Sequence, residues 1–279
     1  MKEDALGIGT ESQASNQPVS GLDMRPTIAW YTARQEELSR HLPTSFDETS
    51  PFEVKNTEFL HLSESRIAAC AALFPPNALA RSSLQTGTIM GKPSLYFSSE
   101  ATPENIQTTS NLSEALTPTA IIPSYTDHKW TETDKLSSSD VWLFQIPQQI
   151  PPAVAEIIHI EGLIHEIAHT IVAQALYQDG YQLILPNGHI VNAYDYIIAF
   201  ANAAENHDPV SHYSSFYKNP NEEFTSLLAI EEEFVETITA RLLGFVYCDN
   251  PDRRLDPLND RPEISIMVDD FLQAEAVVA

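Results

Sequence analysis

The segment from 153 to 177, AVAEIIHIEGLIHEIAHTIVAQALY, limits the fold more than any other part of the chain. It follows a run punctuated by Pro147, Pro151 and Pro152, and its apolar residues recur at helical spacing. Between Leu163 and Val172 the only charged side chain is Glu166. Because a helix that is apolar on all sides has to be buried, we predict one long helix through the core, with the rest of the chain packed around it.

This helix carries the motif HEIAH, formed by His165, Glu166 and His169. Helical positions four apart lie on one face, so the two imidazoles can share one metal ion. Glu166 is offset by about 100° around the helix, from where its carboxylate can reach a water on the metal without being a ligand. The motif therefore predicts Zn²⁺ held by His165 and His169, with Glu166 as general base. The alternative is a pair of core histidines whose hydrogen bonds are satisfied without an ion.

A zinc site of this kind needs a third protein ligand, and the segment from 227 to 245 offers four glutamates. A helical wheel places Glu232 and Glu236 at the edge of the apolar stripe, on a shared face, and turns Glu233 toward solvent. Glu231 falls within the stripe and is expected in the first turn, where a carboxylate suits the helix dipole. We predict Glu232 as the third ligand, with Glu236 as an alternate ligand or as the carboxylate that orients a ligating side chain.

Three other acidic residues compete for the role of third ligand because they lie between the motif and Glu232. They are Asp179, Asp195 and Glu205. None of them sits in so clear a helical frame. His159, one and a half turns before His165, is expected to face elsewhere and to be structural.

The coarse pattern of the chain predicts an α+β fold. Residues 1–22 are rich in Ser, Gln, Gly and Asn and are predicted to be a disordered leader, followed by a single domain over 23–279. Its first part, 23–150, should hold helices at 27–41 and 63–74 and a small sheet made of 92–99, 119–125 and 141–147. The second part, 151–279, should be mainly helical, with a hairpin around Asn187–Gly188 and helices at 193–204, 226–246 and 264–278.

Charge and composition exclude several classes of function. Lys and Arg total 15 against 39 Asp and Glu, a net charge of −24, which disfavours direct binding to nucleic acid or to an anionic membrane surface. No apolar run reaches the roughly 18 residues of a membrane span, and the N-terminus lacks the apolar core of a signal peptide. We therefore expect a cytoplasmic protein, or one secreted by a non-Sec route. Cys70 and Cys248 are expected to be two free thiols.

The HEIAH helix followed by EEFVE at 232–236 resembles the zincin metallopeptidases and, among them, the gluzincins, whose third ligand is a glutamate on a later helix. EEFVE is similar to the corresponding helix of the anthrax lethal factor catalytic domain, and EGLIHEIAH resembles the active-site helix of bacterial type III effector zinc proteases. The resemblance covers two short segments, 160–173 and 231–245. One departure is the 63 positions between His169 and Glu232, which are more than the compact gluzincin spacing.

This resemblance implies a zincin-like fold in which a sheet precedes the active-site helix and its edge strand holds extended substrate. The nearest candidate for that strand is VWLFQIP at 141–147. The resemblance also implies a metal-bound water that attacks a peptide carbonyl, and a Tyr or His that donates to the oxyanion. Tyr213 is the first choice for that donor, followed by Tyr217 and His212.

Two functions from different classes follow. The leading hypothesis is a zinc-dependent endopeptidase that acts on a protein or peptide substrate, which could be basic. The alternative is a catalytically inactive zincin-fold module whose acidic surface binds a basic partner protein.

Overall fold

A computed structural model describes residues 25–42, 49–92, 124–132, 135–146, 148, 150–211, 226–246 and 258–277, and the structural statements below concern these residues. The predicted leader 1–22, Cys248 and residues 93–99 of the first predicted strand lie outside the described residues. Within them the protein is a mixed α+β fold with a small mixed sheet, as predicted.

Two sheets are present in the described part of the chain. The larger one has the order β1-β2-β4-β3, in which β1, β2 and β4 are parallel and β3 is antiparallel to β4. Its strands are β1 (Glu53–Lys55), β2 (Thr88–Lys92), β3 (Ser124–Trp130) and β4 (Leu136–Phe144). The smaller, antiparallel sheet has the order β6-β5-β7. Its strands are β5 (Gln182–Ile184), β6 (Ile190–Asn192) and β7 (Glu275–Ala276).

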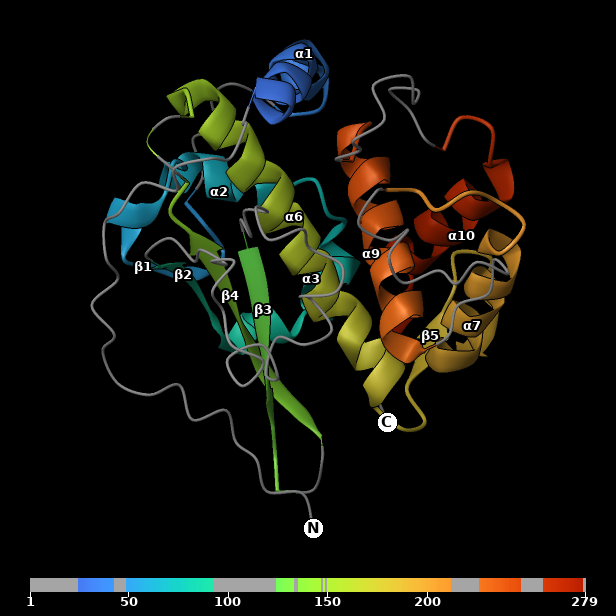
Figure 1. Cartoon of the computed structure of the whole chain (residues 1–279). Coiled ribbons are helices and arrows are strands. Elements are labelled where there is room, and N and C mark those ends of the chain that lie inside the picture. Colours follow the sequence, from blue (N-terminus) through green and yellow to red (C-terminus); the bar gives the residue numbers. More distant parts are fainter. Residues whose placement is uncertain are drawn as a thin grey trace, which may run out of the picture.

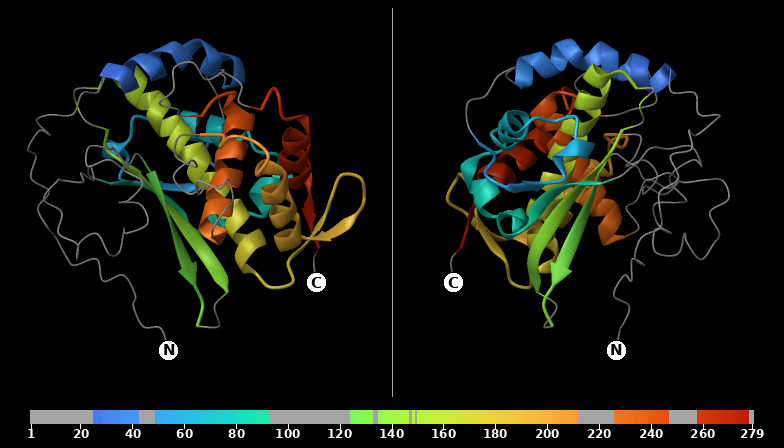
Figure 2. Two further views of the ribbon diagram at one scale, coloured as in Figure 1. Left: turned by 45° about the vertical axis from the view of Figure 1, so that its right-hand side comes forward. Right: turned by 90° about the vertical axis from the view of Figure 1, so that its left-hand side faces the viewer.

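One long helix separates the larger sheet from a helical half, as Figure 1 shows. This helix is α6 (Pro152–Tyr177), and it contacts β3 and β4 on one side and α9 and α7 on the other. The other helices are α1 (Arg25–His41), α2 (Glu64–Ala71), α3 (Pro76–Ala80), α7 (Ala193–Ala204), α9 (Leu227–Leu243) and α10 (Pro262–Gln273), with short 3-10 helices η1 (Thr57–Phe59) and η2 (Ser83–Thr86). α1 crosses over one end of α6 and α9 (Figure 2).

The predicted central helix is confirmed, and its sequence explains both of its ends. Pro152 occupies the first turn, where its missing N–H costs no hydrogen bond, and Gly180 adopts a positive φ of 70° in the turn that follows the helix. Between them the helix is buried on nearly all sides; Ile160, Leu163 and Ile167, for example, are 0% exposed. The HEIAH motif thus lies on a helix that is buried over most of its length.

Other predicted elements also form where local signals were strong. Ser63 caps α2 by accepting a hydrogen bond from the Arg66 N–H, and Ser226 caps α9 in the same way from Ala229. Gly244 ends α9 in the left-handed conformation that glycine tolerates. The hairpin β5–β6 turns at Asn187–Gly188, where Gly188 has a φ of 83°.

The prediction for the larger sheet was wrong in two respects. The strand predicted at 141–147 begins earlier, at Leu136, and it lies between β2 and β3, so it is an inner strand and cannot be the edge that holds substrate. The edge strand on that side of the described sheet is β3, of which the prediction covered only Ser124 and Tyr125. The end of the β3–β4 hairpin near its turn extends beyond the helices in Figure 2, and its residues are mostly polar. The sequence there lacks the alternation of apolar and polar residues from which a strand is predicted.

His159 attaches the start of α6 to the sheet and has the structural role predicted for it. Its side chain is fully buried, its Nδ1 accepts a hydrogen bond from the His61 N–H at 3.0 Å, and its Nε2 lies 2.8 Å from the carbonyl oxygen of Phe144. Because Nδ1 accepts, the ring proton is on Nε2, which donates to Phe144. Both ring nitrogens are therefore satisfied in the neutral form only.

Protonation of His159 should destabilise the fold at acidic pH. Burial lowers the pKa of His159 to about 4, below the value of about 6.5 in the unfolded chain. Between these values the unfolded state binds more protons, so this contribution is complete above pH 6.5 and is lost as the pH falls toward 4. We expect the stability advantage of the wild type over His159→Gln to shrink by about 2 kcal/mol between pH 7 and pH 5. Urea unfolding of both proteins at the two pH values measures it, and an advantage that does not change with pH would contradict the assignment.

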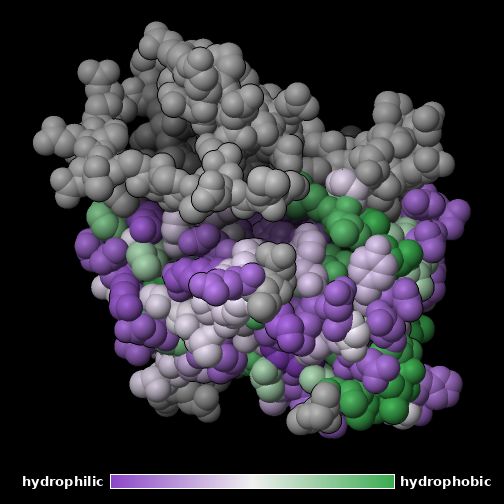
Figure 3. Space-filling view, turned by 90° about the horizontal axis from the view of Figure 1, so that it is seen from below, coloured by the Kyte–Doolittle hydropathy of each residue, from purple (hydrophilic) through white to green (hydrophobic). Residues whose placement is uncertain are grey.

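The described surface is mostly hydrophilic on the face seen in Figure 3, with hydrophobic side chains gathered on the side of the helical half. Large hydrophobic residues exposed in that half include Ile190, Tyr194 and Ile266. Among the helices that the structure describes, none has the length and apolar character needed to cross a membrane.

Candidate metal centre

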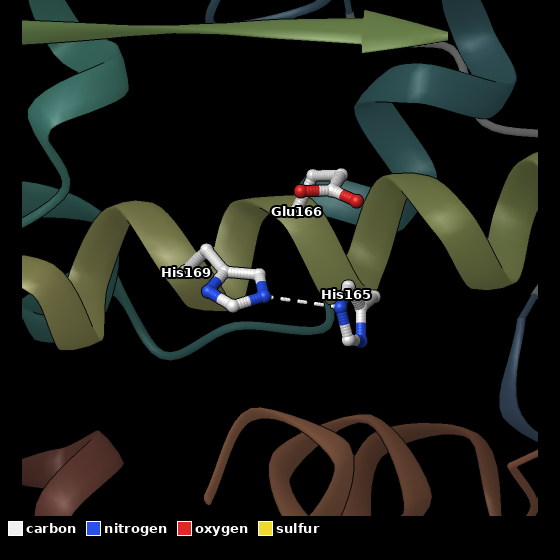
Figure 4. Close-up of side chains that lie close together, drawn as sticks. All are labelled: His165, Glu166 and His169. Carbon is white, nitrogen blue, oxygen red and sulfur yellow. Dashed lines mark hydrogen bonds between the residues drawn. The ribbon is translucent and has the colours of Figure 1, made fainter. Parts of the chain in front are cut away.

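The motif residues of α6 point in two directions. In Figure 4 the rings of His165 and His169 lie together on the side of the helix that faces α9, whereas Glu166 points away from them toward the sheet. The three residues each offer a ligand atom within 4.8 Å of the others. α6 therefore presents two imidazoles to its neighbouring helix and a carboxylate to its neighbouring strand.

Glu232 of α9 meets the two histidines at one point. The Nε2 atoms of His165 and His169 are 3.1 Å apart, and Oε2 of Glu232 lies 3.7 Å from the first and 3.6 Å from the second. Ligand atoms bound tetrahedrally to zinc at 2.0–2.1 Å are separated by about 3.3 Å, so this triangle has the dimensions of one face of a zinc site. Glu232 thus lies within 4 Å of both Nε2 atoms, and its role as third ligand stays a prediction.

The hydrogen bonding of Glu232 also fits a metal ligand. Its side chain is 6% exposed, and its Oε2 has no hydrogen-bond partner among the described residues. A buried carboxylate oxygen without a partner is costly unless a cation approaches it. Glu166 is a poorer third ligand although it is near, because Oε2 of its carboxylate already accepts a hydrogen bond from Thr126 at 2.6 Å.

The two histidines have opposite protonation tendencies. Burial, with the neighbouring His169, holds the pKa of His165 well below its ordinary value. Burial would lower the pKa of His169 as well, but the charges of Glu232 and Glu231 and the hydrogen bond to Glu231 outweigh it and hold that pKa well above its ordinary value. The protonated Nε2 of His169 can thus donate a hydrogen bond to Nε2 of His165. A metal ion bound to both nitrogens would take the place of this proton.

Glu231 orients His169, a role that the sequence analysis did not assign to it. Its Oε1 accepts a hydrogen bond from His169 Nδ1 at 2.8 Å, and its Oε2 accepts one from the Tyr177 hydroxyl at 2.7 Å. A carboxylate on Nδ1 leaves Nε2 to face the metal and makes the imidazole a stronger ligand. The expected position of Glu231 in the first turn was wrong, because α9 begins at Leu227 and no acidic residue lies in its first turn.

The remaining glutamates of α9 are buried. Oε1 of Glu236 lies 3.6 Å from Nδ1 of His165, beyond hydrogen-bond distance, and its Oε2 has no hydrogen-bond partner among the described residues. Burial raises the pKa of Glu236 well above its ordinary value, with further increments from Glu161, Glu232 and Glu233. Glu233 was predicted to face solvent, and this was wrong: it is 1% exposed and accepts hydrogen bonds from the Val210 N–H. The wheel failed because α1, α6, α7 and α10 pack around α9, which therefore has no solvent face over 231–240.

Other predicted site residues are not brought to the histidines or cannot be placed. Asp179 and Asp195 are exposed, in the turn after α6 and in the first turn of α7, and Glu205 lies at the C-terminal cap of α7. Tyr213, Tyr217 and His212 lie outside the described residues, so the choice of an oxyanion donor stays a prediction.

The sequence analysis also missed two residues, Thr126 and Ser124, whose hydroxyl groups donate hydrogen bonds to the carboxylate of Glu166. Burial raises the pKa of Glu166, against the lowering effects of His169 and of hydrogen bonds from the side chains of Thr126 and Ser124. No local signal identifies these two residues, because they belong to a polar strand that is about 40 positions from Glu166.

A scan against protein-family models and searches of curated proteins and of solved structures find no match to this chain.

Proposed function

We propose that this protein is a zinc-dependent endopeptidase with a zincin-like, gluzincin-type arrangement. The observation that supports this most directly is the triangle formed by His165 Nε2, His169 Nε2 and Glu232 Oε2, whose sides of 3.1–3.7 Å suit tetrahedral zinc. Three protein ligands leave a fourth position open, which is typical of catalytic rather than structural zinc.

In this proposal zinc, when bound, supplies Lewis acidity that polarises the scissile carbonyl and makes water more acidic. Glu166 accepts the proton of the attacking water and passes it to the nitrogen of the leaving amine, which restores its carboxylate for the next cycle. Glu231 holds the tautomer of His169 through its hydrogen bond to Nδ1. Burial of these groups strengthens each of these interactions by lowering the local dielectric.

The place of the substrate follows from the corrected sheet order. β3 is the edge strand of the described sheet and contacts α6, so an extended peptide that pairs with it would run past the motif helix. β3 thus takes the role that the sequence analysis gave to 141–147. The net charge of −24 favours peptides with basic residues.

Incubation with a mixed peptide library tests this function. Purified protein with one equivalent of zinc should generate new peptide ends detectable by mass spectrometry, and a chelator should abolish them until zinc is restored. Binding of zinc without cleavage of any peptide would instead favour the second candidate, a catalytically inactive module that uses its acidic surface to bind a basic protein. Absence of zinc binding would contradict the endopeptidase.

A further inference from the structure

The edge strand β3 contacts the carboxylate of Glu166 directly. Side chains alternate along a strand, and Ser124 and Thr126 are the two at its start that face α6, whereas Tyr125 between them points to the opposite face, beside Trp142. The hydroxyl Oγ1 of Thr126 lies 2.6 Å from Oε2 of Glu166 and 3.2 Å from its backbone carbonyl oxygen. A hydroxyl has one hydrogen, and the shorter distance assigns it to the carboxylate.

This contact is buried on both sides. Thr126 is 7% exposed and Glu166 is 5% exposed, so water does not compete freely for either group. A glutamate side chain has three rotatable bonds, and a buried hydrogen bond to a charged oxygen restricts them more strongly than a bond between neutral groups. A carboxylate offers about four acceptor positions, so the hydroxyls of Thr126 and Ser124 leave capacity for the proton of a water.

We propose that Thr126 is a positioning residue, which holds the carboxylate of Glu166 in the orientation where it takes the proton of the attacking water. The inference rests on the proposed function, because it assigns a role to Thr126 only through Glu166 as general base. It also gives β3 two tasks: its outer edge, which pairs with no other strand of the described residues, would take up an extended peptide, while its inward side chains fix the base. A peptide that pairs with β3 would thus lie at a fixed position relative to the carboxylate of Glu166.

Replacement of Thr126 by valine tests this role, because valine keeps the shape and strand preference of threonine and lacks only the hydroxyl. We expect Thr126→Val to lower kcat by about 10- to 100-fold, the range expected for loss of a hydrogen bond to a charged group, with little change in KM or in zinc content. Thr126→Ser, which restores the hydroxyl, should recover most of the loss. Thr88→Val is the matched control: Thr88 is a buried threonine of the same sheet whose hydroxyl donates to Glu53, so its kcat should match the wild type.

A binding measurement separates positioning of Glu166 from a general structural effect. A peptide hydroxamate carries a hydroxyl that can donate to the Glu166 carboxylate, whereas a peptide thiol ligates zinc through sulfur alone. Calorimetry should show the hydroxamate binding about tenfold more weakly to Thr126→Val than to the wild type, with thiol affinity unchanged and with no further weakening when Thr126→Val is added to Glu166→Ala, which has no side-chain acceptor left for Thr126 to hold.

The possible outcomes distinguish failure of the positioning role of Thr126 from failure of the proposed function. A wild type that cleaves peptides, together with a Thr126→Val variant of equal kcat and equal hydroxamate affinity, would overturn the positioning role and leave the proposed function intact. Equal weakening of hydroxamate and thiol would also overturn it, because the variant would then have disturbed the whole site. A wild type that binds zinc and cleaves no peptide would overturn the proposed function, and the positioning role with it.

Discussion

Glu166→Gln is expected to lower kcat by about 10²- to 10⁴-fold, while zinc stays bound. The amide has nearly the shape of the carboxylate and can still accept a hydrogen bond from Thr126, so the fold around it should persist. It cannot take up a proton from water at neutral pH, and the reaction loses its base. Because Glu166 points away from the ring nitrogens of His165 and His169, its replacement should leave the metal ligands in place (Figure 4). Steady-state kinetics and zinc analysis on the same preparation measure both effects.

Glu156→Gln is the matched control for this variant. Glu156 lies on the same helix, two to three turns before the motif, where it forms an ion pair with Arg66. Its replacement should leave kcat within a factor of about two, since partly exposed ion pairs contribute little. Substantial hydrolysis by Glu166→Gln would show that another group takes the proton and would contradict the mechanism.

Glu232→Ala is expected to weaken zinc binding by more than 100-fold and to abolish the stabilisation that zinc gives the wild type. The variant removes the carboxylate oxygen that approaches both Nε2 atoms, and only the two imidazoles remain. A ligand that binds only the folded state at 1,000 times its Kd stabilises it by about 4 kcal/mol. We therefore expect zinc to raise the Tm of the wild type clearly and that of Glu232→Ala hardly at all. Competition with a fluorescent chelator and thermal unfolding with and without zinc measure this.

Two neighbouring glutamates supply graded controls for Glu232→Ala. Glu236→Ala removes an equally buried carboxylate one turn further along α9, and it should retain zinc because Glu236 does not reach either Nε2. Glu231→Gln should weaken zinc binding by about 10- to 100-fold, as expected for an outer carboxylate that orients a ligating histidine. If Glu236→Ala released zinc and Glu232→Ala did not, Glu236 would be the third ligand.

Local sequence determined the elements whose signals lie within a few residues. The apolar periodicity of 153–177 predicted α6 to within one residue at its start, and the spacing of His165 and His169 placed their rings side by side before any tertiary contact was known. The Asn187–Gly188 dipeptide predicted the turn between β5 and β6 for the same reason. In each case the prediction needs only residues within a few positions of one another along the backbone.

The strands were harder to predict because their stability comes from partners that are distant in sequence. β2 contains Gly91 and β1 is only three residues long, so neither shows the alternation of a strand, and both form through parallel pairing with segments 35 or more positions away. Which strand lies at the edge is likewise a property of the whole sheet. The sequence predicted a sheet before α6, and only the pairing of β3 with β4 showed that β3 is the edge strand of the described sheet.

Residues 153–177 alone are sufficient to predict two imidazoles and a carboxylate on one buried helix, since helical periodicity is a local property. How the four glutamates of α9 differ could not be predicted in this way, because it depends on the packing of distant segments. Glu231 reaches His169, Glu232 reaches both Nε2 atoms, Glu233 accepts from Val210, and Glu236 lies beside Nδ1 of His165. Because α9 is enclosed by other helices, the role of each carboxylate depends on which neighbour it faces and not on its distance from a single apolar stripe.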